Sequence, residues 1–167
     1  MCGIAGIVWD GKQPSQPKLE RALSALEHRG PDEAGLYLDD RVGLVHTRLS
    51  IIDLSTGKQP FTYGFDTPVL VFNGEIFNYQ ELRRQLIAKG ATFRTTSDTE
   101  VLYLLLCKYG KSALNRLNGQ FAFAFYEPCS GSILLGRDPF GEKPLYYWDR
   151  CGFAFSSEIK AILQLTD

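Results

Sequence analysis

The sequence lacks an excess of charge of either sign. Its 18 basic residues stand against 19 acidic ones, which leaves a formal net charge of -1. Such a balance provides no basic surface for a nucleic acid or an anionic membrane. The longest strongly apolar run, residues 101–107, is far too short to span a bilayer. We therefore expect no nucleic-acid partner and no membrane association.

A secretory leader and paired cysteines are also missing. The apolar first residues carry neither a basic start nor a small-residue cleavage site. The four cysteines, at positions 2, 107, 129 and 151, form no Cys-x-x-Cys pair, which argues against a zinc site or a redox motif. We expect a cytoplasmic protein without disulfides or a bound metal. Cys107 lies in a helical pattern, and we assign it to the core.

The chain has no nucleotide-binding loop. Residues 136–143 read Gly-Arg-Asp-Pro-Phe-Gly-Glu-Lys and superficially resemble one. However, Glu142 follows the second glycine, and Pro144 stands where a phosphate loop requires Ser or Thr. We expect no ATP site and no cofactor in this chain.

What the sequence does contain is a succession of strand and helix patterns. Its 167 residues, 44% of them hydrophobic, suffice for one domain with a substantial core. Residues 120–126 alternate phenylalanine and alanine, so both faces of that strand are apolar and must be covered. Further strand patterns follow at short intervals, at 133–135, 145–148 and 153–155, which indicates antiparallel pairing. We predict one α+β domain, residues 1–167, with sheets packed between helices.

Four helices are expected. Two begin with a capping residue followed by Glu three positions later, Asn78 with Glu81 and Ser97 with Glu100. The other two show apolar residues at helical spacing. One of them carries Leu19, Ala22, Leu23 and Leu26, and the other begins at Ser157 with Ile159, Ile162 and Leu163 on one side.

Cys2 is the first candidate for chemistry. Methionine is normally removed when the next side chain is small, and Cys2 would then carry a free α-amino group. Such an amine has a pKa of about 7.7–8.0, so part of it is neutral near pH 7 and can accept the thiol proton. One residue then supplies both a nucleophile and a base. The alternative is a small apolar residue at the start of a strand.

Three polar positions offer complementary groups, each with a structural alternative. Asn73 and Gly74, after a strand at 69–72, have the composition of an oxyanion hole, but Asn-Gly is also a strong hairpin-turn signal. Arg48 can bind a carboxylate, or form a surface ion pair. Asp98 can hold an ammonium group, or cap a helix. Taken singly, the structural reading is favoured for each.

The joint occurrence of these signals changes that reading. Six motifs, in this order and spacing, closely resemble the class II glutamine amidotransferase domain, and most nearly the amino-terminal glutaminase domain of glutamine-hydrolysing asparagine synthetases. The resemblance covers essentially the whole chain. Its motifs are residues 1–6, 28–32, 48–53, 73–79, 97–100 and 136–141.

The resemblance implies a fold, a reaction and a set of roles. The family has the four-layer α-β-β-α sandwich of amino-terminal-nucleophile hydrolases. By this resemblance Cys2 attacks the side-chain amide of L-glutamine, a thioester forms, ammonia leaves, and water releases glutamate. Asn73 and the Gly74 N–H hold the oxyanion. Arg48 binds the substrate α-carboxylate, while Asp98 and the Glu75 region receive its α-ammonium. The pocket is lined by Leu49, Ser50, Ile51 and Ile52, and Arg29 is a structural or near-site residue.

The resemblance also implies what lies outside these residues. In synthetases a second domain follows, binds ATP and Mg, and uses the ammonia on an acceptor. That domain is absent from this chain, so we expect a synthetase domain or subunit as partner, with aspartate as the most plausible acceptor. If Met1 were retained, the nitrogen of Cys2 would be an amide and the site inactive.

Two other functions are compatible with the sequence. One is a non-catalytic regulatory or partner-binding domain on the same fold, although such relatives are expected to lose the nucleophile, which is present here. The other is a Cys–His hydrolase that uses Cys107, Cys129 or Cys151 with His28 or His46. It predicts that replacing a histidine abolishes activity, whereas the amino-terminal mechanism predicts a modest effect.

Overall fold

The computed structural model describes residues 1–9, 15–49, 57–150 and 152–166. Within these residues the chain forms eight strands and four α-helices. The strands are β1 (Gly3–Val8), β2 (Glu33–Leu38), β3 (Val42–Arg48), β4 (Val69–Ile76), β5 (Gly119–Glu127), β6 (Ser132–Arg137), β7 (Tyr146–Trp148) and β8 (Phe153–Ser156). The α-helices are α1 (Gln16–Leu26), α2 (Tyr79–Ile87), α3 (Asp98–Tyr109) and α4 (Ile159–Thr166), and 3₁₀ turns occupy η1 (Glu27–Arg29) and η2 (Gly110–Arg116).

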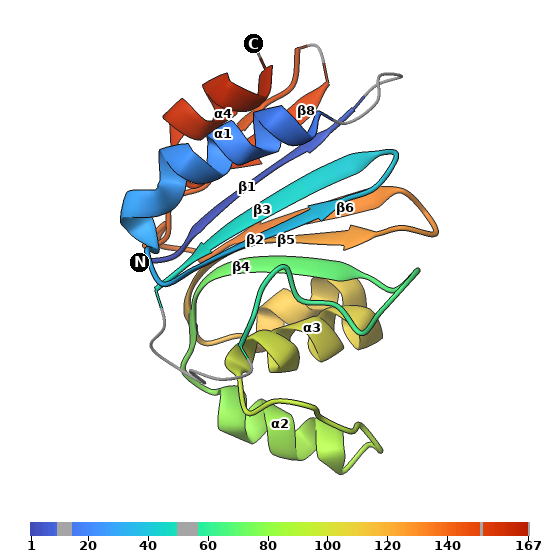
Figure 1. Ribbon diagram of the computed structural model, residues 1–167. Helices are drawn as coiled ribbons and strands as arrows, with labels where there is room; N and C mark the ends of the chain where they lie inside the picture. The colour runs from blue at the N-terminus through green and yellow to red at the C-terminus, as the bar shows by residue number, and fades with distance from the viewer. Residues whose placement is uncertain (10–14, 50–56, 151, 167) are drawn as a thin grey trace.

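The strands form two antiparallel sheets. One sheet has the order β2-β3-β1-β8-β7 and the other β4-β5-β6. Figure 1 shows four layers, with α1 and α4 above the first sheet and α3 and α2 below the second. The predicted α-β-β-α sandwich is confirmed.

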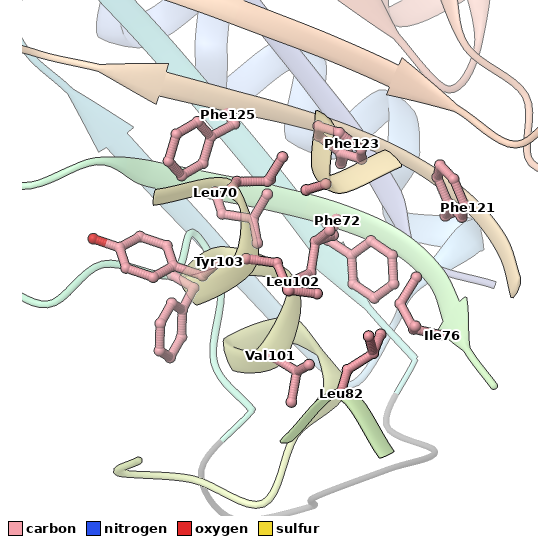
Figure 2. Close-up of a cluster of buried hydrophobic side chains, with 14 of the residues drawn as sticks. Leu70, Phe72, Ile76, Leu82, Val101, Leu102, Tyr103, Phe121, Phe123 and Phe125 are labelled. Atoms are coloured by element: carbon pink, nitrogen blue, oxygen red, sulfur yellow. The ribbon is translucent and has the colours of Figure 1, made fainter. Parts of the chain in front are cut away.

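The alternation within β5 explains how the layers pack. Because successive side chains of a strand point to opposite faces, its phenylalanines and alanines separate. Phe121, Phe123 and Phe125 pack against α3 and α2, and Figure 2 shows them across from Leu102 and Tyr103 of α3. Ala122 and Ala124 face the first sheet, where small side chains let the two sheets approach. Both faces of β5 are therefore buried, as predicted.

Strand β1 lies in the centre of the first sheet and is tied to the far end of the chain. It pairs with β3 on one side and with β8 on the other. Beyond the ladder, the Ile4 carbonyl accepts hydrogen bonds from the Ser157 N–H at 2.8 Å and the Ser156 hydroxyl at 3.0 Å. The Ile4 N–H donates to the Ser157 hydroxyl at 3.1 Å. The residues that follow Cys2 are thus fixed by the junction between β8 and α4.

The helix starts agree with the capping predictions only in part. The Ser97 hydroxyl accepts the Thr99 N–H at 3.1 Å, as an N-cap does. Glu100, however, does not return to Ser97: its carboxylate accepts the N–H groups of Arg94 and Thr95 and the Tyr63 hydroxyl. Asn78 makes no cap bond. Its side chain instead bonds the Arg116 carbonyl and the Asn118 N–H.

Other local predictions were wrong. Cys107 is exposed, because the buried residues of α3 end at Leu106. In α4 the buried residues are Ala161, Ile162 and Leu165, whereas Ile159 and Leu163 are more than half exposed. Asn73 and Gly74 do not form a turn, because β4 continues to Ile76. No helix in the described part of the chain is long and apolar enough to cross a membrane.

Candidate active site

A cavity of about 110 Å³ opens at one end of the space between the two sheets. It gathers residues that lie far apart in the sequence. Of the predicted site residues, Cys2, Arg48, Leu49, Asn73, Gly74, Glu75 and Asp98 all line it. Ser50, Ile51 and Ile52 lie outside the described residues.

Strand periodicity explains why these side chains meet. Ile4, Leu44 and Val71 all point into the core between the sheets. On the same strand faces, Cys2 lies two residues before Ile4, Arg48 four residues after Leu44, and Asn73 two residues after Val71. Their side chains therefore point into the same space. Register supports this placement. Ile4 pairs with His46 and Gly3 with Thr47, so Cys2, just before β1, lies next to Arg48 at the end of β3. The cavity is thus the polar end of the core between the sheets.

Cys2 lies at the floor of this space, half-buried. Its Sγ donates to the Leu49 carbonyl at 3.7 Å, and its own carbonyl accepts the Arg29 Nε–H at 2.9 Å. Burial raises the pKa of the thiol, while the Leu49 hydrogen bond, the N-terminal ammonium and the charges of Arg48 and Lys143 act to lower it. The positive groups therefore favour the thiolate against the effect of desolvation.

Asn73 provides an unsatisfied donor. The residue is 1% exposed, and its Nδ2 has no hydrogen-bond partner among the described residues. A buried polar group without a partner costs roughly 1–3 kcal/mol, and such a group in a native structure calls for an explanation. An amide N–H that is buried at a cavity wall and unpaired is suited to an oxygen that arrives with a ligand.

Gly74 presents its backbone to the same cavity. β4 is an edge strand, and alternate residues along it direct their N–H groups away from β5. On that outer edge the Leu70 N–H donates to the Phe61 carbonyl, and the Ile76 N–H donates to Asp98 Oδ2 at 3.0 Å. Gly74 lies an even number of residues from both Leu70 and Ile76, so its N–H points to the same outer edge, between those two groups. A side chain is excluded here, because a Cβ on Gly74 would lie 2.2 Å from the Gln120 carbonyl oxygen.

Two charges of opposite sign flank the cavity. Arg48 is 4% exposed, and its Nη1 lies 2.7 Å from Glu33 Oε2. Asp98 is equally buried, and burial raises its pKa, with the nearby Glu75 adding to the effect and the Ile76 and Thr99 N–H groups opposing it. A cation beside Asp98 would relieve this cost. The cavity therefore suits a zwitterion with an anionic and a cationic end.

Sequence reasoning missed several residues of the cavity. Gln59, Phe72, Ser97, Thr99, Gln120 and Lys143 also line it. Lys143 lies in the segment 136–143, which superficially resembles a phosphate loop. Hydrogen bonds to one carboxylate hold this segment in place. The Asp138 carboxylate accepts the backbone N–H groups of Phe140, Glu142 and Lys143 at 3.0–3.1 Å. The loop thus brings Lys143 to the cavity.

Neither histidine hydrogen-bonds a thiol in the described part of the chain. His28 is exposed and bonds Glu158 at 2.9 Å. His46 is fully buried, and burial lowers its pKa to about 3, so it is neutral and hydrogen-bonds the Phe72 carbonyl at 3.2 Å. Of the other thiols in the described ranges, Cys107 and Cys129 are both exposed. Those ranges also contain no group of three His, Cys, Asp or Glu that could hold a metal.

Comparison with known proteins places this geometry in context. The family profile described as "Glutamine amidotransferase domain" matches residues 1–167. Asparagine synthetase [glutamine-hydrolyzing] 1 of Bacillus subtilis is 44% identical over 153 residues, which cover 88% of this chain and 24% of the relative. Asparagine synthetase B of Escherichia coli is 40% identical and covers 98% of this chain and 30% of its own length. The chain thus spans about a quarter to a third of these relatives.

A similar fold occurs among solved structures. The glutamine phosphoribosylpyrophosphate amidotransferase of B. subtilis superposes with a TM-score of 0.78 at 24% identity. The match covers 98% of this chain and 43% of that one. At this identity the likeness concerns the fold alone.

Proposed function

The chain belongs to the glutamine amidotransferase domain family, and from that premise we propose that its cavity hydrolyses L-glutamine to glutamate and ammonia through a thioester on Cys2. The single observation that carries the proposal is the meeting of a thiol with an unpaired, buried amide donor. Cys2, just before β1 of the first sheet, and Asn73, on β4 of the second, line one cavity. No other thiol among the described residues lines it.

The substrate's two ends match the two charged walls. The α-carboxylate of glutamine pairs with Arg48, and the α-ammonium pairs with Asp98 and with Glu75. Leu49 lines the cavity, and its carbonyl accepts a hydrogen bond from the Cys2 thiol. We assign Ser50, Ile51 and Ile52 to the same wall by resemblance alone. With both ends fixed, the side-chain amide extends toward Cys2.

The reaction then proceeds in two halves. The Cys2 sulfur attacks the amide carbon, and the carbonyl oxygen becomes an oxyanion that receives the Asn73 Nδ2–H and the Gly74 N–H. The proton released by the thiol passes to the leaving nitrogen, which departs as ammonia. Water attacks the thioester, the C–S bond breaks, and glutamate leaves with the thiol restored. The thiol, the α-amine and water supply these steps, so the proposal requires no cofactor on this domain.

The base is the α-amine of Cys2, which exists only after Met1 is removed. While Met1 is attached, the nitrogen of Cys2 is an amide and cannot take a proton. Met1 is more than half exposed at the cavity, where a peptidase can reach it. We therefore propose that the active form begins at Cys2.

The ammonia is used elsewhere. Because the relatives named above are synthetases several times longer, we propose that this domain supplies a synthetase domain or subunit, which holds ATP and Mg and converts aspartate to asparagine. We place that enzyme in the cytoplasm, with no nucleic acid or membrane as partner. A joined enzyme with Cys2→Ala should still make asparagine from free ammonia but not from glutamine.

The proposal is tested on Cys2 directly. Purified protein is incubated with a diazoketone analogue of glutamine and its peptides are weighed, and glutaminase activity is measured in parallel. We expect Met1 to be absent, one adduct on Cys2, and complete loss of hydrolysis in Cys2→Ala with an unchanged circular dichroism spectrum. Cys129→Ala is the matched control, since that thiol is exposed. Normal turnover by Cys2→Ala would overturn the proposal, and an unlabelled Cys2 in trimmed protein would favour a non-catalytic domain.

A further inference from the structure

The outer edge of β4 has an unusual partner. This strand carries the oxyanion donors, and in its sheet it pairs with a strand on one side only. Within the described part of the chain, its other side carries a single bridge, between Phe61 and Leu70. Two residues further along β4, the N–H and carbonyl of Phe72 point to the same open edge. Both groups hydrogen-bond to a side chain rather than to a strand.

The amide of Gln59 takes the place of a neighbouring strand. Its Oε1 accepts the Phe72 N–H at 2.6 Å, and its Nε2 donates to the Phe72 carbonyl at 3.1 Å. A primary amide thus reproduces the pair of hydrogen bonds that a residue of an adjacent antiparallel strand would make. This arrangement satisfies both backbone groups of Phe72 and leaves Gly74, the next outward residue, facing the cavity.

His46 adds a third hydrogen bond from the other sheet. Its Nε2 lies 3.2 Å from the same Phe72 carbonyl. Because His46 is fully buried and neutral, we assign it as the donor. The Phe72 carbonyl therefore receives two N–H groups, which fill both of its lone pairs.

These contacts act on the oxyanion donors through one peptide group. The Phe72 carbonyl belongs to the peptide bond that ends at the nitrogen of Asn73. Since a peptide group is planar, holding its oxygen from two directions fixes the orientation of the Asn73 backbone. The direction of the Asn73 side chain and of the following Gly74 N–H depends on that orientation.

We propose that Gln59 is a positioning residue that holds the Asn73 and Gly74 donors at the point where the oxyanion forms. The inference rests on the proposed glutamine hydrolysis. Gln59 lines the same cavity but acts through the backbone of Phe72, and it contributes no charge to either end of the substrate. Its loss therefore weakens transition-state stabilisation and leaves ground-state binding of the α-groups in place.

The test compares kcat with KM in Gln59→Leu. The leucine has similar volume and can neither donate nor accept, so we expect kcat to fall about ten-fold or more, since small displacements of catalytic groups carry large costs in rate. The glutamine KM should change less than about two-fold. Gln85→Leu is the control, because Gln85 lies exposed on α2, where its side chain donates to Glu81.

A second readout isolates the oxyanion. Glutamate γ-semialdehyde adds to the thiol and places a negative oxygen where the oxyanion forms, so its inhibition constant should rise in Gln59→Leu by about as much as kcat falls. Gln59→Glu keeps the acceptor for the Phe72 N–H and loses the donor, and it decides the matter if the leucine variant does not fold. We expect its kcat to fall at least as far as that of Gln59→Leu, because a carboxylate oxygen then faces the Phe72 carbonyl and adds negative charge at the cavity.

Two results would overturn the inference. One is a folded Gln59→Leu, or a folded Gln59→Glu, with wild-type kcat and aldehyde affinity. The other is a loss confined to KM, which would make Gln59 a wall of the binding pocket. Failure of the proposed function looks different, because wild-type protein trimmed to Cys2 would then neither hydrolyse glutamine nor be alkylated.

Discussion

At the scale of single residues, Asn73 makes the clearest prediction. Its Nδ2 is buried and has no partner among the described residues, so its hydrogen bond forms only with what enters the cavity. Asn73→Ala should lower kcat by about 10²–10³ and leave the glutamine KM nearly unchanged, because the oxyanion exists only near the transition state. Steady-state kinetics on folded variant protein provide the measurement. A rise in KM at constant kcat would contradict the assigned role.

Lys143 leads to a prediction about thiol reactivity. Its positive charge is one of the groups that lower the pKa of Cys2 against the effect of burial. In Lys143→Met the thiol pKa should therefore rise, and the pH midpoint of Cys2 alkylation by iodoacetamide should move upward. At pH 7 the alkylation rate should fall only a few-fold, because the effective dielectric constant near the protein surface is high and weakens the interaction between the two charges.

This change is followed by peptide-resolved mass spectrometry across a pH series. Lys111→Met removes the same charge from an exposed position outside the cavity lining and should leave the midpoint where it is. An unchanged or lowered midpoint in Lys143→Met would show that Lys143 does not act on the thiol.

Sequence predicted the residues whose chemistry is visible in their type. A cysteine behind the start methionine, an Asn-Gly pair, an arginine and an aspartate each offer a group that suits one part of glutamine, and the structure brings all of them to one cavity. Gln59 could not be found this way. Its importance comes from a backbone edge that exists only once β4 is paired on one side.

At the scale of elements, the junction between η1 and α4 makes stability depend on pH. Burial alone would raise the pKa of Glu158, but hydrogen bonds from Arg29, His28 and Lys160 outweigh it and lower the pKa from 4.5 to about 2. A carboxyl with a depressed folded-state pKa contributes stability above its unfolded pKa, and this contribution is lost as pH falls toward the folded value. Glu158 should therefore stabilise the protein above about pH 5.

Urea unfolding of wild type and Glu158→Gln between pH 2 and 7 measures this contribution. The difference in the free energy of unfolding should be largest above about pH 5 and shrink toward pH 2. Part of this difference comes from Arg29, whose side chain is only 8% exposed and which loses its ion pair with Glu158 in the variant. Glu27→Gln, on the exposed face of η1, serves as control. A difference that is constant with pH would exclude Glu158 as the titrating group.

The same scale shows where pattern reasoning fails. The Ser97 cap was predicted correctly, but Glu100 turns to the preceding loop because Arg94, Thr95 and Tyr63 offer it donors there. In α4 the apolar residues at helical spacing did not identify the buried face, since Ala161 lies against the core and Ile159 does not. Spacing predicts that a helix is amphipathic, and tertiary contacts select which stripe is covered.

At the scale of the whole molecule, the layering followed from the apolar character of both faces of β5. A strand that is apolar on both sides must lie between two other layers, and antiparallel neighbours at short intervals leave a sandwich flanked by helices as the consistent arrangement. The order of strands within each sheet could not be predicted. That β1 lies between β3 and β8 is a matter of pairing between segments about 40 and 150 residues apart, for which the local pattern holds no information.

The hydrogen bonds that join Ile4 to Ser156 and Ser157 determine when, during synthesis, the site can form. A ribosome makes Cys2 long before it makes Ser156 and Ser157, the partners of Ile4. Until residue 157 has emerged, β1 lacks its neighbour β8, and the strand that follows Cys2 is not yet fixed. Unfinished or prematurely terminated chains therefore hold a bare thiol but no pocket. On the proposed function, translation itself would delay the release of ammonia until this domain is whole.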